Sequence, residues 1–129
     1  MSRERIRKPR AVTGRVVLTA TAPALRGATL HVYVEDVSYA DAPAPVIAET
    51  ELTNVNHPAP GRANAPTELP FVLSLAERWA ALDPSARYAV RVWIDADGDG
   101  RVGPGDRFSE QAYPVLTRGF GTSVVVTLI

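Results

Sequence analysis

Hydrophobic and polar residues alternate along most of the chain. Successive side chains of a strand point to opposite faces of a sheet, so this period of two predicts strands that each have one apolar face. A continuous helical period is confined to one short segment. Seven segments carry the alternation and are predicted strands: 14–20, 30–35, 46–52, 69–75, 88–95, 113–117 and 124–128.

The intervals between these segments are rich in turn-forming residues, with 11 Pro and 9 Gly in the whole chain. Several short strands separated by such turns are typical of two sheets that share one core. The pattern therefore predicts an all-β fold, an antiparallel β-sandwich of about seven strands resembling the immunoglobulin or transthyretin arrangement.

One segment departs from the alternation and predicts a short crossover helix between the two sheets. Residues 74–77 fit a capping box, and Leu75, Trp79 and Leu82 follow at helical spacing. The Asp83–Pro84 pair would end the helix. Trp79 is expected to fill the core beneath it.

The length of 129 residues suits one domain. Residues 1–11 are predicted to be a flexible basic tail, and residues 12–129 a single β-sandwich domain. The longest segment without a strand pattern is 53–67, which is expected to be a mobile loop.

The most informative motif is an acidic loop at residues 95–106, Asp-Ala-Asp-Gly-Asp-Gly-Arg-Val-Gly-Pro-Gly-Asp. It fits the calcium-loop template D-x-D-x-D-G, in which side chains at alternate positions converge on one ion and the glycine permits a sharp turn. The predicted metal ligands are the side chains of Asp95, Asp97, Asp99 and Asp106 and the main-chain carbonyl of Arg101.

Two positions of this loop indicate a modest calcium affinity. Gly103 offers no side chain at position nine, and Asp106 replaces the longer Glu that the template has at position twelve. The loop follows a predicted strand instead of a helix, so it would clamp two strands and would not open a helix pair. The alternative is a metal-free turn, since Asp–Gly pairs form turns readily.

Composition narrows the remaining chemistry. The chain has 14 basic and 14 acidic residues, two His and no Cys. Zero net charge argues against a nucleic-acid partner, and the absence of Cys excludes disulfides, thiolate metal sites and a Cys nucleophile. Neither His31 nor His57 has an orienting partner in view for Ser-His-Asp catalysis. The carboxylates of Glu35, Asp36, Glu49 and Glu51 alternate with apolar residues, which indicates solvated strand faces. No enzyme activity is expected.

The expected partners are a calcium ion and a protein. His31, Tyr33 and Trp93 are expected on the outward faces of their strands, where they could form a binding surface. No apolar run is long enough for a membrane span. The N-terminus lacks a signal peptide and a lipid-bearing Cys, so the chain is expected to be cytoplasmic as written, or extracytoplasmic if a leader was removed.

Several stretches resemble a known family. Residues 36–44, Asp-Val-Ser-Tyr-Ala-Asp-Ala-Pro-Ala, follow an opening Val-x-Gly-x-Val at 12–16, and the similarity continues through residues 68–73, 88–95 and 113–119. These stretches resemble the YbaY-like family, which is also described as type III secretion lipoprotein chaperones, or pilotins. The resemblance covers nearly the whole chain from residue 12.

The resemblance implies a small β-sandwich in an envelope-associated, non-enzymatic protein, and the pilotin description implies holding an outer-membrane ring protein in transit. Family members usually have a shorter turn where this chain has its acidic loop. The residues favour a non-catalytic binding or scaffold module with a calcium clamp at 95–106. The alternative hypothesis is a pilotin-like or chaperone-like partner of a secretion or envelope component, without a metal role.

Overall fold

The computed structural model describes residues 10–61 and 64–129, which form strands and one short helix. Most strands are longer than their sequence patterns, but the strand at 88–95 has the predicted length and the one that begins at Tyr113 is shorter than predicted. The helix is of the 3-10 type. In chain order the elements are β1 (Ala11–Leu18), β2 (Leu25–Asp36), β3 (Val46–His57), β4 (Thr67–Ser74), η1 (Ala76–Ala81), β5 (Tyr88–Asp95), β6 (Arg107–Phe108), β7 (Tyr113–Val115) and β8 (Ser123–Leu128).

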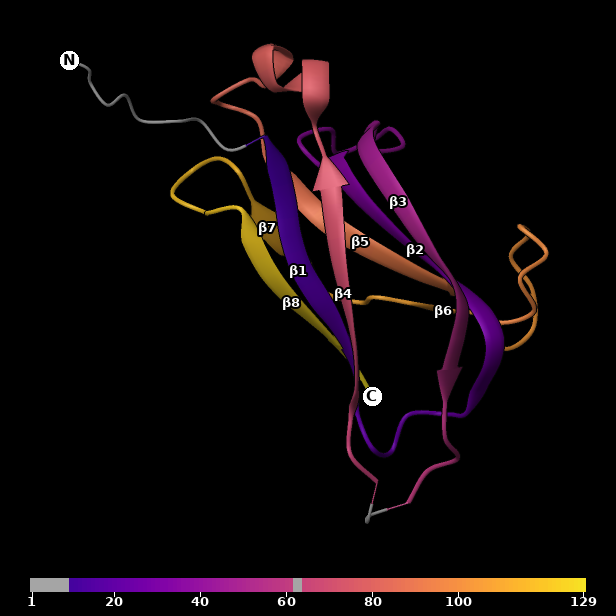
Figure 1. The fold of residues 1–129 in the computed structure, drawn as a ribbon. Helices are drawn as coiled ribbons and strands as arrows, with labels where there is room; N and C mark the ends of the chain where they lie inside the picture. Colours follow the sequence, from indigo (N-terminus) through magenta and orange to yellow (C-terminus); the bar gives the residue numbers. More distant parts are fainter. Residues whose placement is uncertain (1–9, 62–63) are drawn as a thin grey trace.

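The strands form two sheets that pack face to face, which confirms the predicted β-sandwich (Figure 1). The smaller sheet has the order β4-β1-β8. The larger has the order β3-β2-β5-β6, and β7 pairs with β5. The core lies between them, because the inward residue of each alternating pair is apolar and buried. Its largest fully buried side chains are Leu18, Leu30, Leu73, Leu75, Ile94, Val12, Val16, Val32, Val34, Val90, Val92 and Val115.

One pairing differs from the expected antiparallel pattern. β8 lies beside β1 and runs parallel to it, with Gly14 opposite Val124 and Leu18 opposite Leu128. The chain reaches this position by crossing from β7 in the larger sheet to β8 in the smaller one. A connection that changes sheets can return a strand in either direction, whereas a tight hairpin permits only the antiparallel one.

The expected mobile loop at 53–67 is shorter than predicted, because both of its ends belong to strands. β3 continues to His57 and β4 begins at Thr67, leaving residues 58–66 as the connection, of which 62–63 lie outside the described residues. The strand pattern fades because the β2–β3 pairing shifts register between Leu25 and Leu30. Such bulges break the alternation that marks a strand in sequence.

The short crossover lies where it was predicted, between β4 and β5, but it begins one residue later than a Ser74 cap would place it. Leu75 is the N-cap residue, and its side chain is buried in the core. An apolar contact therefore sets the start of the helix. Trp79 is partly buried and packs against the core, as expected.

The first described residues join the sandwich directly. β1 begins at Ala11, inside the segment predicted to be a tail, and the Arg10 carbonyl accepts a hydrogen bond of 2.8 Å from the N–H of Leu75. Residues 1–9 of the predicted tail lie outside the described residues. Across residues 10–61 and 64–129, no helix combines the length and apolar character needed to cross a membrane.

Candidate functional site

The acidic loop connects two neighbouring strands of the larger sheet. Asp95 is the last residue of β5, and the chain returns through β6, where Arg107 and Phe108 pair with Ile94 and Trp93. Both ends of the loop are therefore held by strand hydrogen bonds. This is the isolated, strand-flanked loop that the sequence predicted.

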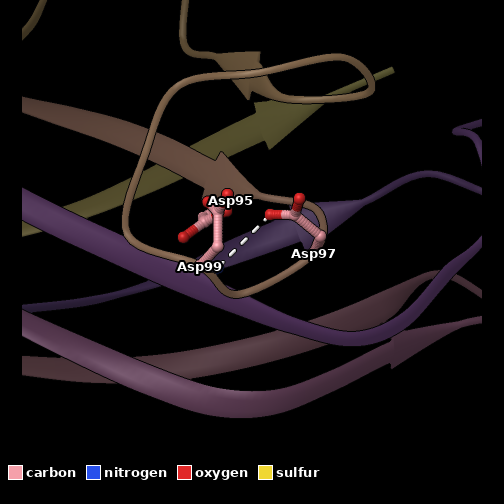
Figure 2. Close-up of side chains that lie close together, drawn as sticks. All are labelled: Asp95, Asp97 and Asp99. Carbon is pink, nitrogen blue, oxygen red and sulfur yellow. Dashed lines mark hydrogen bonds between the residues drawn. The ribbon is translucent and has the colours of Figure 1, made fainter.

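Asp95, Asp97 and Asp99 converge at the start of this loop (Figure 2). One carboxylate oxygen from each lies within 4.8 Å of the others. Asp95 is fully buried, whereas Asp97 and Asp99 are exposed. Hard carboxylate oxygens are the ligands that calcium prefers, so these three residues could hold a cation.

Hydrogen bonds within the loop explain why the carboxylates alternate. Asp95 Oδ2 accepts from the N–H of Gly100 at 2.7 Å, and Asp99 Oδ1 accepts from the N–H of Arg101 at 2.8 Å. Gly98 and Gly100 have φ values of 71° and 79°, a region that favours glycine. Each Asp thus organises the backbone that follows it, and Arg101 lies beside the cluster.

The cluster carries an electrostatic cost. The N–H of Asp99 donates to Asp97 and lowers its pKa, but partial desolvation and the carboxylates of Asp95 and Asp99 act in the opposite direction and leave the pKa of Asp97 raised above 3.8. A raised acid pKa means that the folded loop disfavours the charged form. A bound cation would remove that cost.

Asp106 lies outside the cluster of three and performs a different task. Its Oδ1 accepts from the N–H of Ala96 at 2.9 Å, and its Oδ2 accepts from Trp93 Nε1 at 2.9 Å and from the N–H of Gly103 at 3.0 Å. Partial burial raises the pKa of Asp106, but these three donors outweigh it and leave the pKa below 3.8. In this structure Asp106 braces the loop.

Two aromatic side chains that the sequence analysis placed on outward strand faces, as part of a possible binding surface, lie against the loop. The rings of His31 and Trp93 stack with centroids 4.3 Å apart, and His31 Nε2 lies 3.9 Å from Asp95 Oδ2. The outward direction of both residues was predicted correctly from the alternation. Their contact depends on the β2–β5 register, which places them directly opposite.

Two other polar residues are buried, contrary to the sequence analysis. Glu35 is 7% exposed and accepts a hydrogen bond of 2.9 Å from Arg91 Nε, so it does not belong to a solvated strand face. His57 is 3% exposed. Its Nε2 donates to the Thr19 carbonyl at 2.9 Å, so its Nδ1 accepts from the Thr67 hydroxyl at 2.7 Å. Both ring nitrogens of His57 therefore have structural partners.

The protein is a small β-sandwich in which buried and partly buried polar side chains form hydrogen bonds that hold strands and one acidic loop in place. Over residues 7–128 the chain matches the family described as type III secretion system lipoprotein chaperone (YscW). The chain belongs to this family, which confirms the resemblance found in the sequence.

A solved structure supports the same assignment. The structure described as an alternative pilotin from the type II secretion system of Vibrio cholerae is 29% identical in sequence, with a TM-score of 0.65. The similarity covers 91% of this chain and 94% of that one. No curated protein matched the chain.

Proposed function

We propose that the protein is a pilotin-like chaperone that binds a protein component of a bacterial secretion apparatus. The observation that carries this proposal is the family match over residues 7–128, together with a pilotin structure that aligns with 91% of the chain. The family is described as a lipoprotein chaperone and the solved structure as a pilotin, and both descriptions name a secretion system. The calcium loop is then an addition to the domain and is not its main task.

The partner we propose is an outer-membrane ring subunit. The test is to express the tagged chain in its own bacterium, crosslink in the living cell, and identify the attached proteins by mass spectrometry. We expect a ring subunit among them, and loss of assembled rings in a strain that lacks the protein. Unchanged ring assembly, together with no crosslink to any secretion component, would contradict the proposal.

We propose calcium binding at residues 95–106 as a second, separate function. The specific support is the convergence of carboxylate oxygens from Asp95, Asp97 and Asp99 within 4.8 Å. The main-chain carbonyl of Arg101, the carboxylate of Asp106 and water would complete a shell of six to eight oxygens. Asp106 would have to exchange part of its hydrogen bonding to join that shell, which is consistent with a modest affinity.

The calcium proposal is tested by calorimetry and thermal melts of the metal-free protein. We expect binding heat and a higher Tm at about millimolar calcium. Asp97→Asn should remove both effects. Asp41→Asn is the matched control, because Asp41 is an exposed carboxylate in a different loop. Equal responses of the two variants, or no response of the wild type, would exclude a calcium site here.

A site of modest affinity also implies a location. Calcium at about 10⁻⁴ to 10⁻³ M is found outside the cytoplasm, where loops of this strength are filled. We therefore propose that the calcium-bound form belongs to an extracytoplasmic compartment.

A further inference from the structure

The outer face of the larger sheet is built differently from an ordinary solvated strand face. Alternate residues of β2, β3 and β5 point away from the core there, and the pairing register aligns them in rows. Phe108 of β6 joins the row of Trp93. We call this surface the aromatic-acidic face, and its residues are His31, Tyr33, Glu49, Glu51, Arg91, Trp93 and Phe108.

The rings of this face form a connected series. His31 stacks on Trp93 at 4.3 Å, Trp93 on Phe108 at 6.1 Å, and His31 lies 6.2 Å from Tyr33, with interplanar angles between 6° and 14°. The Arg91 guanidinium lies 4.8 Å from the Tyr33 ring centroid and 6.0 Å from that of Phe108. Mutual packing fixes these side chains, so a partner would meet an ordered surface.

The charges on this face do not balance. Arg91 is already paired with Glu35 at 2.9 Å. Glu49 and Glu51 remain exposed on the neighbouring strand, opposite Tyr33 and His31. Glu51 has a 3.6 Å contact with His31 Nδ1, which supplies a positive charge only when that ring is protonated. The exposed carboxylates therefore give the face a negative rim beside aromatic rings.

On the outer face of the smaller sheet, the charge of the acidic residue Glu68 is balanced by a basic neighbour. Glu68 of β4 forms an ion pair of 3.0 Å with Arg15 of β1. Val72 and Val125 are exposed on the same sheet, at 60% and 44%. Among the described residues, that face therefore offers apolar contact and an acidic group whose charge is already paired.

We propose that the aromatic-acidic face docks a segment of the protein partner in which Lys or Arg side chains are spaced between apolar ones. The basic groups would lie against the exposed carboxylates of Glu49 and Glu51, which attract them through opposite charge. The apolar side chains would cover Phe108, which is 38% exposed. This inference rests on the proposed chaperone function and identifies the docking surface.

The first test uses two synthetic peptides of equal length, one of Lys and Leu and one with Glu in place of every Lys. Each is titrated into the ¹⁵N-labelled protein, and amide chemical shifts are followed by NMR. We expect the Lys peptide to shift the amide signals of β2, β3, β5 and β6. Its affinity for the protein should fall as the salt concentration rises. The Glu peptide should produce no shifts on this face.

Substitutions then assign the contacts. Glu49→Gln combined with Glu51→Gln should weaken binding of the Lys peptide about five- to tenfold, because two exposed charges are removed. Phe108→Ser should weaken it by a similar factor through lost apolar contact. Glu68→Gln is the matched control, because it neutralises an exposed carboxylate on the opposite sheet and should leave affinity unchanged.

The inference is overturned if the Lys peptide shifts amides of β1, β4 and β8 instead, or if the Glu68 control weakens binding as much as the paired Glu49 and Glu51 variant. It is also overturned if that paired variant still crosslinks to its ring subunit at the wild-type level in cells. In this last case the chaperone proposal stands and only the surface is wrong. Failure of the wild-type chain to crosslink would instead contradict the chaperone proposal.

Discussion

At the scale of single residues, His57 shows how a polar side chain can serve the core. It is the last residue of β3, its side chain is buried, and both of its ring nitrogens are hydrogen-bonded to other segments. A buried polar group that has both partners adds directional contacts, but its removal leaves those partners unsatisfied. His57 therefore ties the β1–β2 connection to the start of β4.

Replacing His57 with Leu should destabilise the protein by about 2–3 kcal/mol. The substitution keeps an apolar volume but leaves the Thr19 carbonyl and the Thr67 hydroxyl without their partner. Urea unfolding measures the change. Thr67→Val is the comparison, and it should cost less because His57 keeps its bond to Thr19. A His57→Leu protein as stable as the wild type would show that water replaces the imidazole.

These residue-level contacts could not be read from the sequence, because the partners are far apart along the chain. Thr19 lies 38 positions from His57, and Arg91 lies 56 positions from Glu35. Alternation predicts which face a side chain points to, and it correctly directed Glu35 outward. It does not indicate that an Arg on the neighbouring strand will cover that carboxylate.

At the scale of elements, the acidic loop has two parts with different roles. Asp95, Asp97 and Asp99 converge, whereas Asp106 holds the beginning, the middle and the supporting strand of the loop together. The spacing predicted both the turn and the cluster, because both follow from local backbone geometry. It did not reveal the role of Asp106, since Trp93 supplies one of its hydrogen bonds from within β5.

Asp106→Ala should loosen this loop and destabilise the protein by about 1–2 kcal/mol, because three N–H groups lose their acceptor at a partly exposed site. Urea unfolding gives the change in stability. Fluorescence in a Trp79→Phe background should show Trp93 becoming more solvated. Asp41→Ala, at an exposed carboxylate, should change neither measurement.

The calcium effect should depend on pH. The pKa of Asp97 is raised, so its charged form destabilises the metal-free fold above that pKa, and this cost disappears once the group is protonated. Calcium requires the charged form. The rise in Tm with calcium should therefore shrink as the pH is lowered from about 7 to about 4. Melts with and without calcium at each pH isolate the effect, and a pH-independent difference would argue against carboxylate ligands.

At the scale of the whole molecule, periodicity predicted the sandwich because most strands bury one face in a shared core. It missed β6, since Arg107–Phe108 is too short to show a period. It also missed the start of β2 at Leu25, where bulges interrupt the alternation. The periodicity could not predict the parallel pairing of β1 with β8, because the alternation of polar and apolar residues within a strand does not determine which strands are neighbours.

Gly14 makes that parallel pairing possible. A Cβ at this position would lie 1.9 Å from the main-chain oxygen of Val124 and 3.0 Å from Phe71. Gly14→Ala should therefore separate β1 from β8 and destabilise the protein by about 3 kcal/mol or more. Gly121→Ala is the matched control, because its Cβ would meet nothing within 4 Å. Thermal melts of the two variants should differ by many degrees.

The pairing of the first described strand with the last also determines when the molecule can fold. Until β8 is synthesised, β1 presents an unpaired edge, and the smaller sheet consists of the antiparallel pair of β1 and β4 alone. Contacts between such distant segments slow folding and expose strand edges in the meantime. A ribosome-bound chain lacking residues 123–128 should therefore be sensitive to proteases and to aggregation, and the domain should become protected in a single step once the final strand emerges.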